Sequence, residues 1–387
     1  MIRDKNINSL FLLDDNITYL NHGSFGACPK PIFESLQKYQ TQLENQPVQF
    51  LDHDSQTLMI KSRNCLAEFI DCNPENLVFF QNPTTAINEI VRSLKLNKND
   101  EILSTNHEYG AMDKTWNFIC KKTGAKYIKS TIKLPVTDEQ TFTNNFLASV
   151  TSNTKIFFLS HMTSATGLYF PVEEICKFAK KNNILTIIDG AHIPGHFPLS
   201  INNLQPDIYV GACHKWLLCP KGVSFLYVDK KLQKDIDPII ISWGYDSEYP
   251  IEHSEFQVNH YWQGTRDVSA FLTIPEAIQF RQEYNWNNIS KKCKERIIEF
   301  RSEIHQIINT QSMIGNNPKD WLGQMYSFQV QYEDFIKLKN IFINDYKIEI
   351  PIMRWEDKTL IRISLNGYNS ENDIEKLLNV MKTINSN

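Results

Sequence analysis

Residues 184–222 read ILTIIDGAHIPGHFPLSINNLQPDIYVGACHKWLLCPKG, and this stretch decides the fold. Two short apolar runs, 184–189 and 207–211, are typical of buried strands. The first run ends in Asp189, and Lys215 follows the second run, 26 residues further along the chain. In parallel α/β sheets, the carboxyl ends of neighbouring strands meet at one edge, where ligands bind. The stretch therefore predicts a carboxylate and a lysine at the same edge of a sheet.

The same alternation of short apolar runs and helical patterns extends from about residue 75 to about 230. Helices are expected at 84–94, 112–122 and 172–181. Further strands are expected at 77–81, 101–105, 126–131, 155–160 and 222–228. Repeated β–α alternation predicts an α/β fold with a large, mainly parallel seven-stranded sheet that is covered on both faces.

The pattern changes after about residue 265. A long helix (288–308) is followed by a strand (325–331), a helix (334–344), two strands (347–351 and 359–365) and a final helix (370–384). This order predicts a smaller α+β domain. We expect a large domain over 20–265 and a small one built from 266–387 and the N-terminal arm, 1–19. Residues 36–70 are expected to form one or two helices, with a break at Pro47.

Composition and charge limit the classes of function. The 40 basic and 44 acidic residues give a net charge of −4, so no general basic footprint for nucleic acid is present. The apolar runs are too short to span a membrane, and the N-terminus lacks the features of a signal peptide. Eight cysteines without a CxxC pair favour reduced thiols in a cytoplasmic enzyme.

A third segment adds a phosphate-binding element. The run 77–81 leads into Asn82-Pro83-Thr84-Thr85, where a helix is expected to begin. Free amides at a helix start bind phosphate, although capping alone also explains such threonines. An acid that holds a pyridinium nitrogen, a lysine that forms a Schiff base and a phosphate site are what pyridoxal 5′-phosphate requires. The three segments together predict that cofactor.

Several motifs then show a family resemblance over nearly the whole chain. They are YLNHGSFGACPKP (19–31), NPTTAINEIVRSL (82–94), HEYGA (107–111), SHMTSATGLYFPVEEI (160–175), IDGAHIPG (188–195), DIYVGACHKWL (207–217), YWQGTRD (261–267) and IRISLNGYN (361–369). In these motifs the chain resembles the class V aminotransferase family of fold-type I pyridoxal-phosphate enzymes. It looks most like the isopenicillin N epimerase-like branch, which is related to the cysteine desulfurases.

The resemblance implies roles around the cofactor. Lys215 would form the Schiff base, Asp189 would bind the pyridine nitrogen and Tyr109 would stack on the ring. The phosphate would be held by Thr84, Thr85 and His214. His192 would contact the ring hydroxyl, near the loop that carries Ser164. Thr265 would reach the phosphate of a neighbouring subunit, which implies a homodimer with shared active sites.

The resemblance also implies a substrate site. Arg362 matches an arginine that clamps a substrate α-carboxylate, and its fork of donors suits that task. Asn21 and His22 lie in an N-terminal loop that should approach the substrate. Purely structural roles remain open for three of these residues: His192 as a structural histidine, Tyr109 as a helix-packing residue and Arg362 as a salt-bridge partner. Glu108, Trp116 and Trp262 are assigned to packing or to the surface.

The expected reaction acts at Cα or Cβ of an amino acid through an external aldimine, by epimerisation or C–S bond cleavage. Transamination is an alternative. Desulfuration is disfavoured because 346–359 contains no cysteine to receive sulfur. Among other classes, a non-catalytic binding protein of this fold typically lacks the lysine. A Rossmann protein needs a Gly-rich turn after its first strand, and the segment 82–85 is not one. A metal hydrolase built on Asp189, His192 and His214 is a further alternative.

Overall fold

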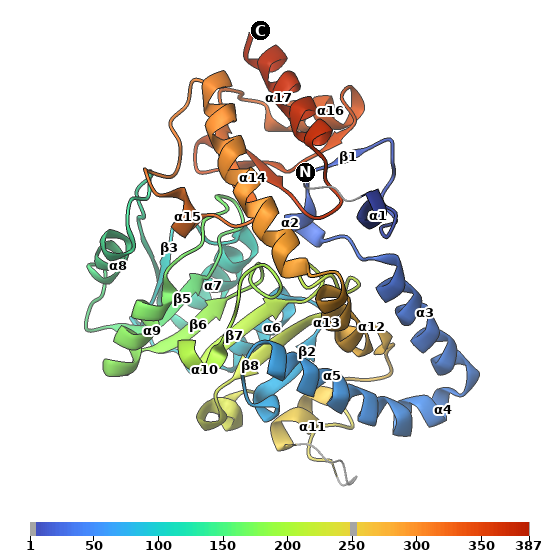
Figure 1. Cartoon of the computed structure of the whole chain (residues 1–387). Coiled ribbons are helices and arrows are strands. Elements are labelled where there is room, and N and C mark those ends of the chain that lie inside the picture. Colours follow the sequence, from blue (N-terminus) through green and yellow to red (C-terminus); the bar gives the residue numbers. More distant parts are fainter. Residues whose placement is uncertain (1–4, 248–253, 387) are drawn as a thin grey trace.

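A computed structural model of the chain describes residues 5–247 and 254–386 (Figure 1). Its centre is a seven-stranded sheet in the order β2-β8-β7-β6-β5-β3-β4. The strands are β2 (Leu77–Phe80), β3 (Glu101–Thr105), β4 (Lys126–Ser130), β5 (Thr154–Ser160), β6 (Leu185–Asp189), β7 (Ile208–Ala212) and β8 (Ser224–Val228). Only β8 runs antiparallel to its neighbours within this sheet. The predicted mainly parallel seven-stranded sheet is therefore confirmed.

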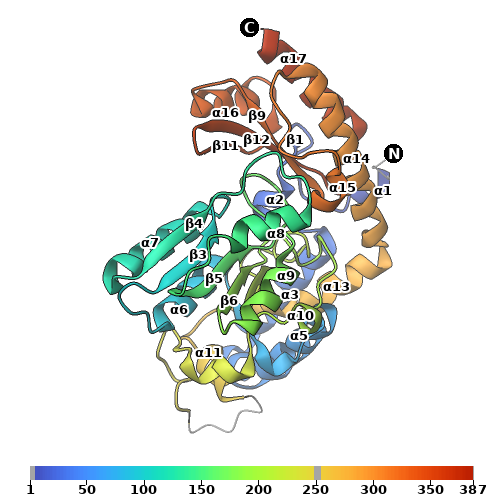
Figure 2. The same ribbon diagram turned by 90° about the vertical axis from the view of Figure 1, so that its left-hand side faces the viewer.

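Helices cover both faces of the sheet because side chains alternate along each strand. On β2, Val78 and Phe80 pack into one apolar cluster, whereas Leu77 and Phe79 pack into the other. The first cluster is covered by α6 (Pro83–Ser93), α7 (Gly110–Thr123) and α11 (Glu255–Tyr261). The second is covered by α5 (Ser55–Phe69), α8 (Glu139–Leu147), α9 (Val172–Lys181), α10 (Ile201–Leu204), α12 (Ser269–Leu272) and α13 (Ile274–Glu283). Figure 2 shows α6 and α7 on one side of the sheet and α8 and α9 on the other.

The N-terminal region runs along the edge of the molecule before it enters the sheet. It contains α1 (Lys5–Asn8), β1 (Thr18–Tyr19), α2 (His22–Phe25), α3 (Lys30–Asn45) and α4 (Pro47–Gln49), followed by a π-helical turn (Phe50–Asp54) and α5. The predicted break at Pro47 is present, because a proline cannot donate the amide hydrogen bond that would continue α3. Two short 3₁₀ helices, Pro74–Asn76 and Lys230–Asp235, flank β2 and β8.

The C-terminal part forms a second, three-stranded antiparallel sheet, in the order β11-β12-β9. Its elements are α14 (Trp286–Ile307), α15 (Pro318–Trp321), β9 (Met325–Val330), α16 (Phe335–Asn344), β10 (Ile348–Glu349), β11 (Ile352–Trp355), β12 (Lys358–Ser364) and α17 (Glu371–Ser386). The strand expected at 347–351 is reduced to β10, which pairs with β1 instead. The sequence reading missed β11, a short strand after Pro351, and also α8 and α11–α13.

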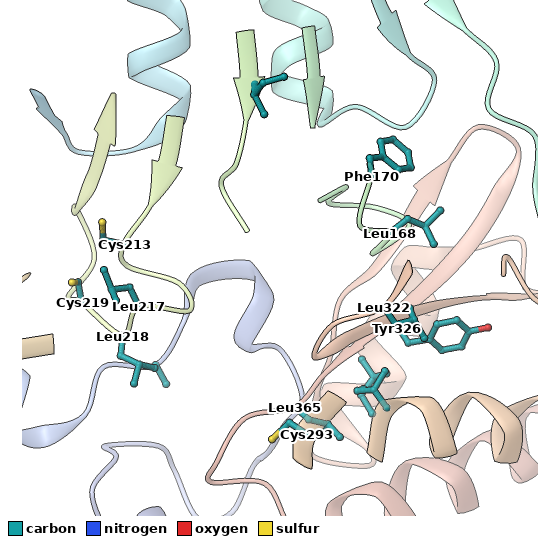
Figure 3. Packing of buried hydrophobic residues seen from close by; sticks show 14 of the residues in the cluster. Leu168, Phe170, Cys213, Leu217, Leu218, Cys219, Cys293, Leu322, Tyr326 and Leu365 are labelled. Carbon is teal, nitrogen blue, oxygen red and sulfur yellow. The ribbon is translucent and has the colours of Figure 1, made fainter. Parts of the chain in front are cut away.

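The two parts share one apolar core. The larger cluster includes Cys213 and Leu217 from the turn after β7, and Leu322, Tyr326 and Leu365 from the C-terminal part, as Figure 3 shows. Within the described residues, the helices are too short or too polar to cross a bilayer. The continuous core holds the C-terminal sheet over the carboxyl edge of the large sheet.

Candidate active site

A cavity of about 630 Å³ opens where the carboxyl ends of β2, β5, β6 and β7 meet. Most of the predicted site residues line it: Thr84, Tyr109, Ser164, Asp189, His192, His214, Lys215 and Arg362. These residues come from segments far apart in the sequence. Asp189 ends β6, Lys215 follows β7, and Arg362 lies on β12 of the C-terminal sheet. The predicted meeting of a carboxylate and a lysine at one sheet edge is thus found.

The Lys215 amine is held in a state that favours nucleophilic chemistry. Burial, together with the positive charge of Arg362, lowers the pKa of Lys215 from 10.5 to about 7, although Asp189 opposes the shift. Its Nζ lies 3.1 Å from Nε2 of His192. Because Nδ1 of His192 accepts a hydrogen bond from the Trp216 indole at 3.4 Å, the neutral ring carries its proton on Nε2. His192 therefore donates to a neutral Lys215 amine.

Asp189 is a buried carboxylate with spare accepting capacity. Burial raises its pKa, and the Ala191 amide and the charge of Lys215 oppose that effect. Oδ1 accepts the Ala191 amide at 3.0 Å, which is its only hydrogen bond within the described structure. Oδ2 is therefore available to a donor in the cavity, such as a protonated ring nitrogen.

The opposite end of the cavity suits a phosphate. Asn82 caps α6 by accepting the Thr85 amide at 2.8 Å and the Thr85 hydroxyl at 3.1 Å, while Thr84 faces the cavity. His214 donates through Nδ1 to the Val223 carbonyl at 2.9 Å. Burial, followed by the charge of Lys215, lowers the pKa of His214 to about 4. In the neutral ring Nε2 carries no proton. It can donate to a phosphate only when the charge of the bound anion favours the doubly protonated, positively charged ring.

Arg362 is a buried guanidinium without an acidic partner among the described residues. Its side chain donates to the Ser164 carbonyl at 2.6 Å and to the Ser24 hydroxyl at 2.9 Å, and Nε has no hydrogen-bond partner. Burial lowers its pKa to about 10, so it remains charged at neutral pH. A buried charge that has only neutral acceptors is costly unless an anion binds. The salt-bridge alternative for Arg362 is not supported.

Four predicted residues lie outside the cavity. Thr85 is engaged in the cap of α6, and Thr265 is exposed. Asn21 is buried beside β12, where it bridges to Ser364. His22 contacts the Lys215 carbonyl at 3.1 Å and the Tyr368 hydroxyl at 2.9 Å. Asn21 and His22 thus hold the backbone around the site, rather than reaching into it.

The N-terminal loop reaches the cavity through the residues that follow. Gly23, Ser24 and Phe25 line it. Gly26 has φ +68° and ψ 170°, and a Cβ there would lie 2.2 Å from the His214 carbonyl oxygen. Only glycine permits this approach, so the SFG motif at 24–26 was the available signal for the contact.

The sequence reading also missed three charged residues in the cavity, Lys221, Arg266 and Asp267. Lys221 donates to the Gly26 carbonyl at 3.1 Å, which fastens the N-terminal loop to the lysine turn. In the sequence, the only indication was that Lys221 lies in the turn after Lys215 and that Arg266 and Asp267 directly follow Thr265.

The residues present fit pyridoxal 5′-phosphate. A lysine of lowered pKa, a carboxylate with a free acceptor oxygen and a helix start lie in one cavity, in agreement with the donors and acceptors that the cofactor needs. Over the ranges 5–247 and 254–386, no three His, Cys, Asp or Glu side chains converge as metal ligands. Asp189, His192 and His214 therefore do not form the ligand set of the metal-hydrolase alternative.

Comparisons with known proteins agree with this geometry. The family model described as "Aminotransferase class-V" matches residues 18–377. An isopenicillin N epimerase of Amycolatopsis lactamdurans is 30% identical over 386 residues, which cover 96% of each chain. A hercynylcysteine sulfoxide lyase of Schizosaccharomyces pombe is 24% identical and covers 96% of this chain and 95% of its own. The fold is similar to that of a cysteine desulfurase from Thermococcus onnurineus, with a TM-score of 0.84 and 18% identity over 100% and 99% of the two chains.

Proposed function

The chain belongs to the class V aminotransferase family of pyridoxal-phosphate enzymes, and from this premise we propose that it acts on an amino acid by epimerisation at Cα or by C–S bond cleavage. The observation that carries the proposal is Arg362. Its unpaired, buried guanidinium lies in the same cavity as Lys215 and Asp189. An α-carboxylate is the anion that would satisfy it while bringing Cα toward the lysine.

When bound, the cofactor supplies an electron sink for a carbanion at Cα. The protein residues supply orientation and proton transfer. Arg362 binds the carboxylate through two N–H groups, with Ser24 and Ser164 fixing the plane of the guanidinium. Lys215, whose pKa is about 7, can take a proton from Cα and return it at neutral pH. Asp189, whose Oδ2 makes no hydrogen bond in the described structure, would hold the ring nitrogen of the cofactor.

Tyr109 is the residue whose role differs between the two reactions. Its side chain lines the cavity and is 47% exposed. Epimerisation needs a proton donor on the face opposite Lys215, and the Tyr109 hydroxyl is our candidate. C–S cleavage needs a donor near the leaving sulfur instead. The curated relatives include both an epimerase and a sulfoxide lyase, so both reactions stay in the proposal.

Desulfuration remains disfavoured. Cys213 and Cys219, which flank the lysine turn, are fully buried and do not line the cavity. Burial raises the pKa of both thiols far above the usual range, so neither is a ready nucleophile.

We further propose that the enzyme is a cytoplasmic homodimer. Thr265 is exposed near the cavity residues Arg266 and Asp267, which suits a contact with the cofactor phosphate of a second subunit. The segment 239–245 exposes large apolar side chains, including Ile241 (62%) and Trp243 (74%), as an interface would. Eight free cysteines support a reducing compartment. Sedimentation of the purified protein tests the dimer, and Trp243→Ser should weaken it.

The function is tested with the purified holoenzyme in D₂O. L-amino acids and L-cysteine conjugates are supplied, and Cα exchange, inversion and release of pyruvate or ammonia are measured. Exchange with inversion supports epimerisation, and pyruvate supports C–S cleavage. Lys215→Ala should abolish both turnover and the visible absorbance of the bound cofactor. Turnover retained by this variant would refute the proposal.

A further inference from the structure

Glu108 is a buried carboxylate whose hydrogen-bond partner Ser160 lines the active-site cavity. It follows β3, and its side chain bridges to the end of β5. Oε1 accepts the Thr105 hydroxyl at 2.6 Å, whereas Oε2 accepts the Ser160 hydroxyl at 2.6 Å and the Ser160 amide at 2.9 Å. The assignment of Glu108 to packing or surface is therefore incomplete, because both of its oxygens accept hydrogen bonds from the ends of two strands.

The residue that Glu108 holds lies next to Asp189. Ser160 pairs with Asp189 across β5 and β6, and both line the cavity. Burial raises the pKa of Glu108 to about 7, and the negative charge of nearby Asp189 adds to this rise. The hydrogen bonds from Ser160 and Thr105 oppose the rise. No lysine or arginine pairs with Glu108 in the described structure. Two carboxyl groups are thus buried close together, and the only cation among the described residues whose charge acts on either pKa is Lys215, beside Asp189.

This arrangement is expensive in the absence of a positive charge. Two neighbouring carboxylates disfavour each other's ionisation, and burial adds to that cost. A neutral glutamine could not make the same bonds, because its amide nitrogen cannot accept the Thr105 hydroxyl, whereas the carboxylate accepts all three donors. These hydrogen bonds favour the ionised form of Glu108 but are outweighed by burial and the charge of Asp189, and a cation beyond Asp189 would favour the ionised form further.

We propose that Glu108 is a positioning residue for the ring-nitrogen end of the cofactor: it fixes Ser160 beside Asp189 and adds a second negative charge that stabilises a proton on the ring nitrogen. The inference rests on the proposed function, because it requires bound pyridoxal phosphate. A protonated ring nitrogen withdraws electrons more strongly, so the second carboxylate strengthens the electron sink. The effect is reciprocal, since the charged ring favours ionised Glu108.

The test compares wild type, Glu108→Gln and the control Glu101→Gln. Glu101 begins the same strand at its other end and also accepts a hydroxyl hydrogen bond, from Thr151 at 2.5 Å. For each apo protein the thermal midpoint and the dissociation constant of pyridoxal phosphate are measured. The ¹⁵N chemical shift of the bound, ¹⁵N-labelled ring then reports the protonation of its nitrogen.

Glu108→Gln should bind the cofactor about tenfold more weakly and shift the ring nitrogen toward its unprotonated signal. Glu101→Gln should match wild type in both. A lower thermal midpoint with an unchanged nitrogen signal would reduce Glu108 to a structural role and overturn the inference. If Glu108→Gln does not fold, Glu108→Asp replaces it and should keep the protonated signal, whose loss would equally overturn the inference. Failure of wild type to bind the cofactor would instead overturn the proposed function, and the inference with it.

Discussion

Replacing Arg362 by glutamine should make the Lys215 amine less reactive, even in the absence of cofactor and substrate. Arg362 is the second cause, after burial, of the lowered pKa of Lys215. At a pKa of about 7, half of the Lys215 amines are neutral at pH 7, compared with about one in 3,000 for an ordinary lysine. Removing a cation from a buried neighbourhood raises the pKa of the remaining one, so the neutral fraction falls.

The magnitude follows from the rank of the two causes. Burial persists in Arg362→Gln, so Lys215 does not return to ordinary behaviour. We expect its acylation rate at pH 7 to fall about fivefold to tenfold, which is the size of a single charge interaction in a partly polarisable interior. The assay is competitive acetylation of the apo protein over a range of pH, with the Lys215 peptide quantified by mass spectrometry.

A matched control separates local charge from general damage. Arg354→Gln removes an exposed arginine from β11, the neighbouring strand of the same sheet. Its Lys215 titration should coincide with that of wild type. An Arg362→Gln profile that also coincides with wild type would refute the electrostatic reasoning, since burial alone would then set the reactivity of the lysine.

Three other changes test separate parts of the structure. Gly26→Ala should cost about 2–4 kcal/mol in urea denaturation, because alanine strains at φ +68° and meets the His214 carbonyl; unchanged stability would show that the loop can move away. Glu89→Leu should lower stability by about 3–5 kcal/mol, because it leaves His260 buried without the carboxylate that lies 2.7 Å from its Nε2. A loss below about 1 kcal/mol would contradict this. Tyr109→Phe should slow inversion at Cα at least tenfold while leaving Cα deuterium exchange nearly intact, as measured by NMR; parallel loss of both would assign Tyr109 to binding.

The sequence predicted the large sheet well because its strands are short apolar runs that end in distinctive residues. The run before Asp189 and the helix 172–181 were located to within a residue. Strand order and the antiparallel direction of β8 were not readable, because they depend on contacts between segments far apart in the chain. β11 escaped notice since it is four residues long and follows a proline.

The candidate site divides in the same way. Asp189 and Lys215 were found because each lies at or just beyond the end of an apolar strand, where a charged side chain needs a partner, whereas Arg362 was identified through the family resemblance. Ser24 and Lys221 carry no such contrast in the sequence, and only the close approach of the N-terminal loop brings them to the cavity. For Glu108 the sequence left packing and the surface open, because a glutamate before a helix often lies in solvent; its burial between the strand ends agrees with packing.

The attachment of His22 to Lys215, Asn366 and Tyr368 has a consequence for biosynthesis. His22 and Tyr368 are separated by more than three hundred residues of chain, so the ribosome synthesises Tyr368 long after His22. A nascent chain can complete its large sheet early, but the lysine turn keeps an open flank until residue 368 arrives. Cofactor capture is therefore expected only after residue 368 has been synthesised, and fragments that retain the whole large sheet but end before residue 366 should emerge colourless.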